Sequence, residues 1–328
     1  MGHANNETDC EMANDQTQND GMAIVILGDP RDDHAEYMAA YLETQGTRVE
    51  FLDSTTFPRQ TRLWYDPGRG DGAIEFPSGG RLAFEQIRSV YWRNYAGIGG
   101  GALPDAEQAY IADNDARSLF ESLLQDLPAR WVNGWSAFQL HQTKPVAFAR
   151  VASLGVAVPN TLLGNDPDAV LDFVDRHEHC IFKPIQGGAH TERVAVEHLT
   201  SANLATLAAA PVTIQEEVIG TDIRVFVAGE KVMACEIRTE VLDFRNDPNP
   251  DIVAIELPEA IAGASRRIAC ALDLVWTGID FRRTADGRFV FLEANPSPMF
   301  LGFEQRTGLP LTESLAALLL DGDGADAS

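Results

Sequence analysis

The spacing of hydrophobic positions changes along the chain and predicts different elements in different regions. A short apolar run at 23–29 precedes apolar positions at helical spacing that stop at Gly46, and a second apolar run follows at 48–53. This strand–helix–strand order predicts a parallel sheet. Alternating residues at 62–92, interrupted by DPGRGDG and PSGG, predict hairpins that lead into the strand 89–94.

From residue 105 onward, helices and strands are predicted to follow one another closely. Apolar positions at helical spacing predict a long amphipathic helix at 105–127 and shorter helices at 144–155, 166–177, 264–274 and 311–320. Apolar runs and alternation predict strands or extended segments at 158–164, 180–185, 212–219, 222–240, 277–283 and 289–295.

These elements predict an α/β domain followed by two α+β units. The expected divisions are a disordered acidic tail at 1–21, an N-terminal α/β domain at 22–130, a small α+β unit at 131–211, a larger antiparallel α+β unit at 212–320, and a flexible tail at 321–328.

Composition narrows the classes of partner. The formal net charge is −24, which argues against nucleic acid as a partner because phosphate contacts drive that affinity. No apolar run approaches the eighteen or so residues of a membrane span, and the N-terminus has no apolar signal region. The four cysteines show no close pairing, so we expect reduced thiols and a cytoplasmic protein.

Lysine is scarce in this sequence. Only three of the 25 basic residues are lysines, so a lysine beside a strand end or a glycine turn is a better candidate for a functional role.

The clearest chemical signal lies in two strands near the C-terminus. Asp280 lies in the first, GIDFRR, and Glu293 and Asn295 lie in the second, FVFLEAN. Residues two apart on a strand face the same side, and paired strands lie about 4.8 Å apart. Two carboxylates and an amide oxygen gathered there would repel one another unless a divalent cation such as Mg²⁺ bound them. A structural hydrogen-bonded cluster is an equal alternative from these residues alone.

Two further groups could bind a phosphorylated ligand. Lys183 ends an apolar strand just before Gly187 and Gly188, where one charge and several backbone N–H groups could meet phosphates. An ordinary loop lysine is the alternative. The strand that carries Gln215, read as an edge strand, could pair with the hydrogen-bonding edge of a base, and an acidic strand end facing solvent is the alternative.

Three arginines lie in or just after the long strands between these groups. They are Arg224, Arg238 and Arg245. A guanidinium suits a carboxylate or an acyl phosphate, although structural ion pairing with the many acids would also explain each of them.

The order of motifs resembles one superfamily. QTKP, FKPIQGG, IQEEVIGTDIRVF, GIDF and FLEANP follow one another as in ATP-grasp ligases, over about residues 23 to 320. The chain is similar to the glutathione synthetase/RimK-like branch. WVNGWSAFQLHQTKP and EQRTGLPLTESLAALLL resemble the microviridin-type (graspetide) maturation ligases. The resemblance implies a pre-ATP-grasp domain followed by two α+β units that clamp ATP.

The resemblance also implies residue roles. Phosphate contacts fall to Lys144 and Lys183, with the glycine turn of Gly187 and Gly188. Adenine contacts fall to Gln215, Glu216, Glu217 and Val218, and the ribose contact falls to Asp222. Arg245 would help to hold the acyl phosphate, and Arg224 and Arg238 would line the same groove. Two Mg²⁺ ions, or Mn²⁺, would be bound by Asp280, Glu293 and Asn295.

The implied reaction is ADP-forming ligation of a carboxylate to an amine or hydroxyl. The first hypothesis is a ligase that makes ω-ester or ω-amide links in a precursor peptide. The alternatives are a ligase that joins an amino acid to a protein tail or small molecule, and a nucleotide-binding protein without catalysis. SPMFLGFE after FLEANP departs from the graspetide pattern, so the acceptor class stays open. Family members often form homo-oligomers, and Arg93 in the N-terminal domain is a candidate acceptor contact.

Overall fold

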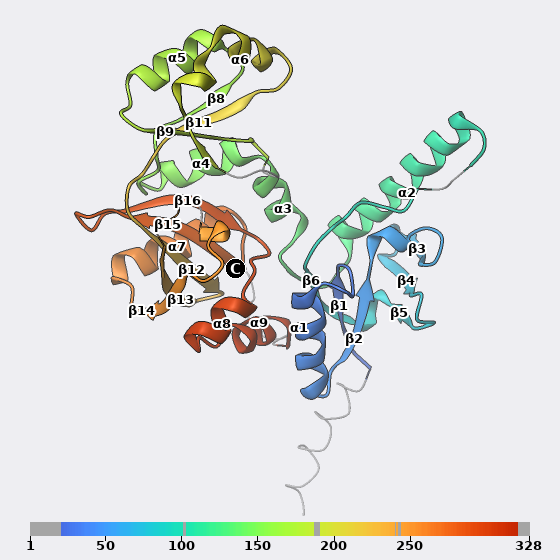
Figure 1. Cartoon of the computed structure of the whole chain (residues 1–328). Coiled ribbons are helices and arrows are strands. Elements are labelled where there is room, and N and C mark those ends of the chain that lie inside the picture. The colour runs from blue at the N-terminus through green and yellow to red at the C-terminus, as the bar shows by residue number, and fades with distance from the viewer. Residues whose placement is uncertain (1–20, 101–102, 187–190, 240, 242–243, 321–328) are drawn as a thin grey trace, which may run out of the picture. The chain divides into compact units, whose positions relative to one another are not determined.

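The computed structural model describes residues 21–100, 103–186, 191–239, 241 and 244–320 (Figure 1). The chain separates into two compact units. The first contains the residues up to Val132 together with those from Ala316 onward, and the second runs from Asn133 to Leu315. Among the described residues, no helix has both the length and the apolar character that crossing a membrane would require.

The first unit contains the predicted parallel sheet. Strands β2, β1, β6 and β7 lie in that order, with every neighbouring pair parallel. A separate antiparallel sheet, β3-β4-β5, corresponds to the predicted hairpins. The elements are β1 Ala23–Leu27, α1 Asp33–Thr44, β2 Arg48–Leu52, η1 Ser54–Thr56, β3 Arg62–Asp66, β4 Asp71–Glu75, β5 Arg81–Ala83, η2 Phe84–Gln86, β6 Ile87–Trp92, α2 Ala106–Asp126 and β7 Arg130–Val132.

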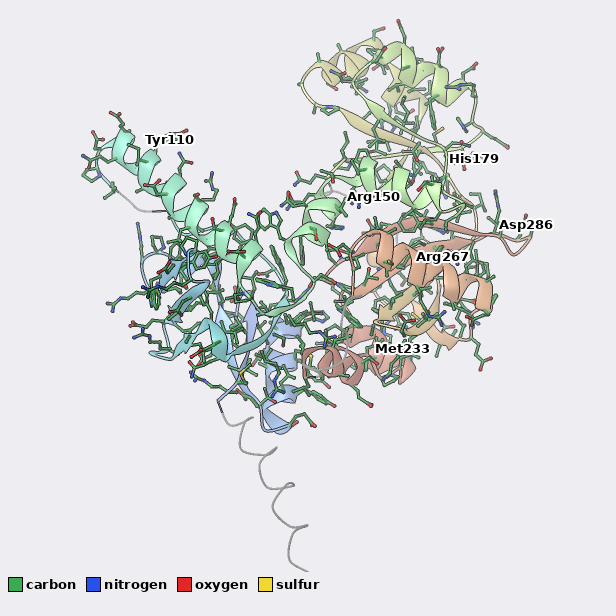
Figure 2. The ribbon with its side chains drawn as sticks, turned by 180° about the vertical axis from the view of Figure 1, so that it is seen from behind. Tyr110, Arg150, His179, Met233, Arg267 and Asp286 are labelled. Carbon is green, nitrogen blue, oxygen red and sulfur yellow. The ribbon has the colours of Figure 1, made fainter. Side chains whose placement is uncertain are left out.

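Burial in this unit follows the pattern of apolar residues. All five residues of β1 are buried, as expected for a strand of a parallel sheet that is covered on both faces. Asp32 begins α1 by accepting hydrogen bonds from the backbone N–H groups of His34 and Ala35. The buried residues of α2 all lie in its C-terminal half, whereas Tyr110 near its start is 71% exposed (Figure 2).

The second unit contains two sheets. The smaller has the order β10-β9-β11-β8, and the larger has the order β14-β13-β12-β15-β16. The elements are α3 Trp135–Gln142, α4 Lys144–Ser153, β8 Thr161–Gly164, α5 Pro167–Asp175, β9 Cys180–Lys183, β10 Glu192–Arg193, η3 Val196–Leu199, α6 Ser201–Ala205, η4 Thr206–Ala208, β11 Val212–Glu216, β12 Thr221–Ala228, β13 Lys231–Arg238, η5 Phe244–Asn246, β14 Asp251–Ile255, α7 Glu259–Ala271, β15 Trp276–Arg283, β16 Phe289–Asn295, α8 Leu301–Thr307 and the first part of α9 Leu311–Leu320, whose residues from Ala316 onward belong to the first unit.

Alternation gives the smaller sheet two different faces. Ile214 and Phe182 are cross-strand partners and pack with Phe173 of α5 in an apolar cluster. Their neighbours Lys183 and Thr213 are paired on the opposite face. The expectation that the 212–219 strand lies at an edge was wrong: β11 has β9 on one side and β8 on the other, and it ends at Glu216.

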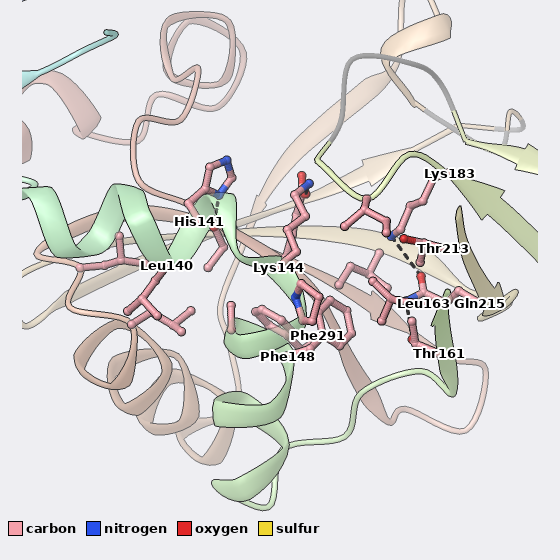
Figure 3. A pocket seen from close by; sticks show the side chains of 18 of the residues that line it. Leu140, His141, Lys144, Phe148, Thr161, Leu163, Lys183, Thr213, Gln215 and Phe291 are labelled. Carbon is pink, nitrogen blue, oxygen red and sulfur yellow. Dashed lines mark hydrogen bonds and ion pairs between the residues drawn. The ribbon is translucent and has the colours of Figure 1, made fainter. Parts of the chain in front are cut away.

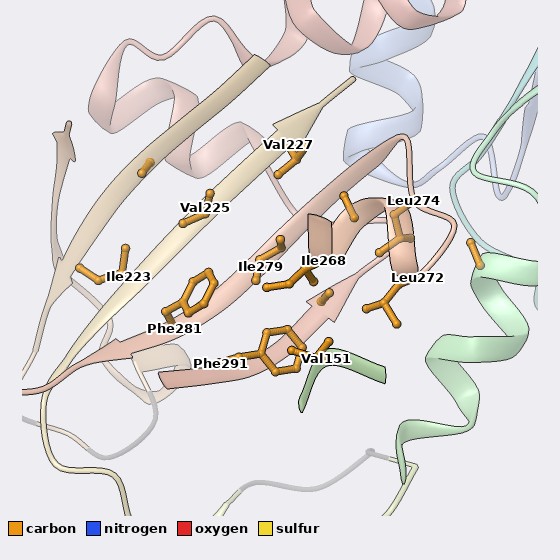
Figure 4. Close-up of a cluster of buried hydrophobic side chains, with 14 residues drawn as sticks. Val151, Ile223, Val225, Val227, Ile268, Leu272, Leu274, Ile279, Phe281 and Phe291 are labelled. Atoms are coloured by element: carbon orange, nitrogen blue, oxygen red, sulfur yellow. The ribbon is translucent and has the colours of Figure 1, made fainter. Parts of the chain in front are cut away.

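The larger sheet also has one apolar face. Its core side carries side chains from β12, β15 and β16, and α4 and α7 supply further members of the same cluster (Figure 4). Phe148 of α4 meets Phe291 of β16 edge to face, with 5.7 Å between ring centroids. Arg150 of α4 donates a hydrogen bond to the carbonyl oxygen of Ala271 in α7 (Figure 2). The opposite face carries the buried rings of Phe226 and Trp276 toward the start of β15. Toward the start of β12 it carries polar side chains, and this part of the sheet is the polar face.

Candidate functional site

Three charged residues form a row across the polar face of the larger sheet. Arg224 of β12 is paired with Asp280 of β15, and Asp280 is paired with Glu293 of β16. Paired residues of antiparallel strands point to the same face, so the register that the sequence left open does bring the two carboxylates together. Asn295 is paired with Gly278, two positions along from Asp280 on the same side.

A bulge in β16 makes this arrangement compatible with the core. The pairing shifts between Asp280 and Phe281, because Asp280 pairs with Glu293 whereas Phe281 pairs with Phe291. Leu292 is the extra residue. In a regular strand Phe291 and Glu293 would share a face; here Phe291 is in the apolar cluster while Glu293 stands in the polar row. The bulge thus separates an aromatic core residue from a carboxylate two positions away.

Each carboxylate of the row has a cationic partner. Arg224 Nε lies 2.5 Å from Asp280 Oδ1, and its Nη2 donates a hydrogen bond of 3.1 Å to Oδ2. Lys144 Nζ, at the start of α4, lies 3.3 Å from Glu293 Oε2. Gly278 makes room for the guanidinium: a Cβ there would stand 2.9 Å from Arg224 Nη1. Arg224 also lies over the Phe303 ring, 5.3 Å from its centroid.

Burial and neighbouring charges act differently on the two acids. Burial raises the pKa of Asp280 to about 7; Arg224 opposes that rise and the Glu293 carboxylate adds to it. Burial also acts to raise the pKa of Glu293, but the attraction of Lys144, Arg224 and Lys183 is larger in sum and lowers it. Adding positive charge here would relieve the repulsion between the two carboxylates.

The donors fit a hard divalent cation such as Mg²⁺. Asp280, Glu293 and Asn295 offer carboxylate and amide oxygens, and Mg²⁺ is typically bound by one or two carboxylates completed by water and substrate phosphates. In the described part of the chain, no three His, Cys, Asp or Glu side chains are grouped so that they could hold a metal by themselves. Phosphate or water oxygens would have to complete the site.

A pocket lies beside the row, with about 660 Å³ of empty space that includes open solvent (Figure 3). Both candidate phosphate lysines, Lys144 and Lys183, line it together with Gln215 and Glu293. Lys183 Nζ donates to Gln215 Oε1 at 3.2 Å, and Gln215 Nε2 donates to Thr161 Oγ1 at 2.8 Å.

The pocket includes residues that the sequence analysis did not select. Thr161, Leu163 and Thr213 share the pocket-facing side of the smaller sheet, and period-two alternation in β8 and β11 was the signal that could have found them. The bulge residue Leu292 also lines the pocket. His141 is a lining residue too; burial lowers its pKa, which favours a neutral ring whose Nδ1–H donates to the carbonyl oxygen of Ala294.

The predicted adenine and ribose contacts are in ion pairs or hydrogen bonds in this structure. Glu216 accepts from Asn160 Nδ2 at 2.7 Å. Glu217 pairs with Arg193 at 2.6 Å, and the hydrogen bonds from Arg193 lower the pKa of the Glu217 carboxyl. The backbone N–H of Glu217 donates to the carbonyl oxygen of His179. Val218 follows β11 without belonging to a strand.

Asp222 lies on the polar face with the charged row. It pairs with Arg282, with 2.9 Å between Oδ1 and Nε. Asp222 also precedes Arg224 by two positions in β12, so both point to the same side.

The predicted group of three arginines does not line one groove. The strand pairing puts Arg238 on the opposite side of the larger sheet from Arg224, because Arg224 pairs with Cys235 and side chains alternate along β13. Arg238 instead pairs with Glu236 and Asp251. The side chain of Arg245 lies outside what the structure describes, as do Gly187 and Gly188.

In the first unit, Arg93 is buried and pairs with Asp32 at 2.8 Å.

Comparison with known proteins identifies the fold. The model of the RimK-like ATP-grasp domain matches residues 141–319, which is more than half of the chain. The probable alpha-L-glutamate ligase 1 of Shewanella baltica is 31% identical over 178 residues, 49% of this chain and 57% of that protein. The chain therefore spans little more than half the length of this curated relative.

Solved structures match over nearly the whole chain. The ATP-grasp ligase PsnB, complexed with a phosphomimetic variant of minimal precursor, Mg and ADP, is 30% identical, with a TM-score of 0.77 over 91% of this chain and 99% of that one. The macrocyclase MdnC of Microcystis aeruginosa, bound with precursor peptide MdnA, is 22% identical with a TM-score of 0.79 over 91% of this chain and 99% of that one, a likeness of fold alone. The expected ATP-grasp fold is thus confirmed, and the chain belongs to the RimK-like ATP-grasp family.

Proposed function

We propose that the chain is an ATP- and Mg²⁺-dependent ligase that activates side-chain carboxylates of a precursor peptide and links them to hydroxyl or amine side chains of that peptide. The observation that carries the proposal is the match to PsnB, which is 30% identical with a TM-score of 0.77 over 91% of this chain. A RimK domain protein of Sphaerobacter thermophilus covers the same share, but at 15% identity and a TM-score of 0.60. The higher identity and TM-score favour the substrate class of PsnB.

The proposed reaction has two steps. A side-chain carboxylate oxygen of the peptide attacks the γ-phosphorus of ATP, the bond to the β–γ bridging oxygen breaks, and ADP leaves. A hydroxyl or amine then attacks the acyl carbon of the acyl phosphate and loses its proton, and inorganic phosphate leaves. Each link therefore removes one water from the peptide.

The residues of the site suit these steps. Lys144 and Lys183 would bind phosphate oxygens from two sides of the pocket, and Arg224 would face the reacting carboxylate. Asp280, Glu293 and Asn295 would hold two Mg²⁺ ions, or Mn²⁺, which would supply neutralisation of negative charge on the transferred phosphoryl group. Lys144 and Arg224 pair with the same carboxylates that would hold the metal.

Binding would involve ATP and a peptide, with no role for nucleic acid or membrane. The described cysteines, Cys180, Cys235 and Cys270, are free thiols, which supports a reduced, cytoplasmic setting. Self-association of the chain stays a prediction.

The test is phosphate release from Mg·ATP with and without a short peptide encoded beside the gene, followed by mass spectrometry of the peptide. Release stimulated by the peptide, with a loss of about 18 Da for each link as one water leaves, would support the proposal. Turnover that leaves every such peptide unchanged would refute the peptide substrate.

A second candidate follows from the 31% identity to the glutamate ligase. In that reading the acceptor is a free amino acid, a small molecule or a protein tail. Glutamate-stimulated phosphate release, with a mass gain on the acceptor, would favour it. Tight nucleotide binding with no turnover for any acceptor would favour a protein without catalysis.

A further inference from the structure

Asn133 is a fully buried amide at the start of the second unit. Its side chain is 0% exposed. Nδ2 donates to the carbonyl oxygens of Trp276 and Pro296, both at 2.6 Å. Oδ1 accepts from the backbone N–H groups of Val275 at 2.7 Å and Trp276 at 3.2 Å. A side-chain amide has two donor hydrogens and two acceptor lone pairs, so all four are used.

These four bonds join the ends of the two strands that carry the candidate metal ligands. Trp276 begins β15, the strand of Asp280. Pro296 directly follows Asn295, the last residue of β16. Thr277 Oγ1 adds a hydrogen bond of 2.8 Å to the carbonyl oxygen of Asn295. One amide and one hydroxyl thus hold the backbone on the C-terminal side of Asn295.

The end of β16 needs such support because its sequence limits other bonding. Pro296 and Pro298 have no backbone N–H, so neither can donate a hydrogen bond that extends the ladder. The ladder itself ends at the pair of Gly278 and Asn295. A ligand residue at the last position of a strand would otherwise lie on a fraying end, whereas a metal site needs its ligands within about 0.5 Å of the binding geometry.

We propose that Asn133 is a positioning residue that fixes the turn after β16 and thereby holds Asn295 in place for a divalent cation. Asn133 does not touch the cation; it acts through the backbone of Trp276 and Pro296. The proposal rests on the metal site of the proposed function. It goes beyond that function by adding a residue 162 positions away in sequence from Asn295 to the machinery of the site.

The test measures binding rather than turnover. Mn²⁺ binding to the full chain in the presence of ADP is followed by electron paramagnetic resonance, and ADP binding without metal is followed by calorimetry. For Asn133→Ala we expect Mn²⁺ affinity to fall by about 10- to 100-fold, the usual effect of losing support behind a metal ligand, while metal-free ADP affinity stays within about two-fold.

Two further variants separate positioning from general loosening of the unit. Thr277→Val removes the hydroxyl bonded to Asn295 and keeps the shape of the side chain, so its Mn²⁺ affinity should fall in the same way, and it carries the test if Asn133→Ala does not fold. Ile268→Val trims a fully buried residue of α7 in the same unit and should leave Mn²⁺ affinity unchanged.

Each contrary outcome has a distinct meaning. Unchanged Mn²⁺ affinity in folded Asn133→Ala or in Thr277→Val would overturn the positioning role, as would an equal loss of ADP and Mn²⁺ binding or the same loss in Ile268→Val. If the unaltered chain binds ADP but no Mn²⁺ with it, the metal site of the proposed function fails, and the positioning role fails with it.

Discussion

A single methyl group at Gly278 should displace Arg224 from Asp280. A Cβ there would lie 2.9 Å from Arg224 Nη1, 3.3 Å from Arg224 Cδ and 2.8 Å from Pro298 Cβ. Contacts this short are not tolerated in a packed interior, so the guanidinium or Pro298 must move. The side chain of Arg224 is 9% exposed and its ion pair with Asp280 is short, so there is little room to relax without changing that pair.

Gly278→Ala should change the stability of the fold, the turnover rate and the affinity for ATP to different extents. Overpacking should lower the free energy of unfolding by about 1–3 kcal/mol. Misplacing a charged donor at the reacting group should lower kcat by about 10²–10³, the range seen when one stabilising donor is lost. The affinity for ATP should change much less, because Lys144 and Lys183 line the pocket from other elements.

The assay is peptide-dependent phosphate release for kcat, with urea unfolding for stability. Gly302→Ala is the matched control: a Cβ there meets nothing within 4 Å, and the residue lies in α8 of the same unit. It should gain stability by up to about 1 kcal/mol because alanine favours helix. If Gly278→Ala turns over at the rate of the unaltered chain, the position of Arg224 over β15 has no role in the reaction.

Three other changes test separate parts of the site and fold. Glu293→Gln should abolish turnover and leave the chain folded, because it removes a charged metal ligand; phosphate release and thermal unfolding measure the two. Lys183→Met should lower kcat/KM for ATP by about 10² through loss of a phosphate contact, whereas Lys231→Met, at the exposed start of β13, should have no effect. Asp32→Asn should lower the free energy of unfolding at pH 7 by about 1–3 kcal/mol by weakening the partly buried pair with Arg93, measured with urea.

The Asp32 prediction has a pH dependence. Burial acts to raise the pKa of Asp32, but the hydrogen bonds from Arg93 and the backbone of Ala35 outweigh it and bring the pKa below 3.8. Ionised Asp32 therefore stabilises the fold at neutral pH, and that contribution is lost as the pH falls through the folded-state pKa. The difference between Asp32→Asn and the unaltered chain should shrink in acid, and a constant difference down to low pH would contradict the assignment.

Controls for these variants come from the same elements. Asp33→Asn changes the neighbouring exposed acid of α1, and Asp286→Asn changes an exposed acid in the turn of the Glu293 hairpin (Figure 2). Either control behaving like its test variant would show that the loss of one negative charge, rather than the named contact, causes the effect.

The acid cluster could be predicted from sequence because its signal is local. An apolar strand that ends in Glu293 and Asn295, after a turn from a strand with Asp280, limits where those side chains can point. The bulge at Leu292 could not be predicted, because it depends on which residue of the partner strand pairs with which. It is the feature that reconciles Phe291 in the core with Glu293 on the polar face.

Two predictions from the sequence, the edge position of the strand at 212–219 and the placement of Arg238 beside Arg224, were wrong for different reasons. The position of β11 inside its sheet depends on strand order, which brings β8 and β9 to either side of it and leaves no mark within the strand itself. The face of Arg238, in contrast, could have been worked out. A two-residue turn between Ala228 and Lys231 pairs those residues, and counting back pairs Arg224 with Cys235, so Arg238 falls on the other side.

The most direct test of the account is to measure whether oxygen passes from the activated carboxylate of the peptide to the released phosphate. A precursor peptide with ¹⁸O in its Asp and Glu carboxylates is incubated with Mg·ATP and the purified chain, and the released phosphate is analysed by mass spectrometry. An acyl phosphate requires one ¹⁸O in each phosphate formed during linkage. Linked peptide accompanied by phosphate without ¹⁸O would contradict activation through an acyl phosphate.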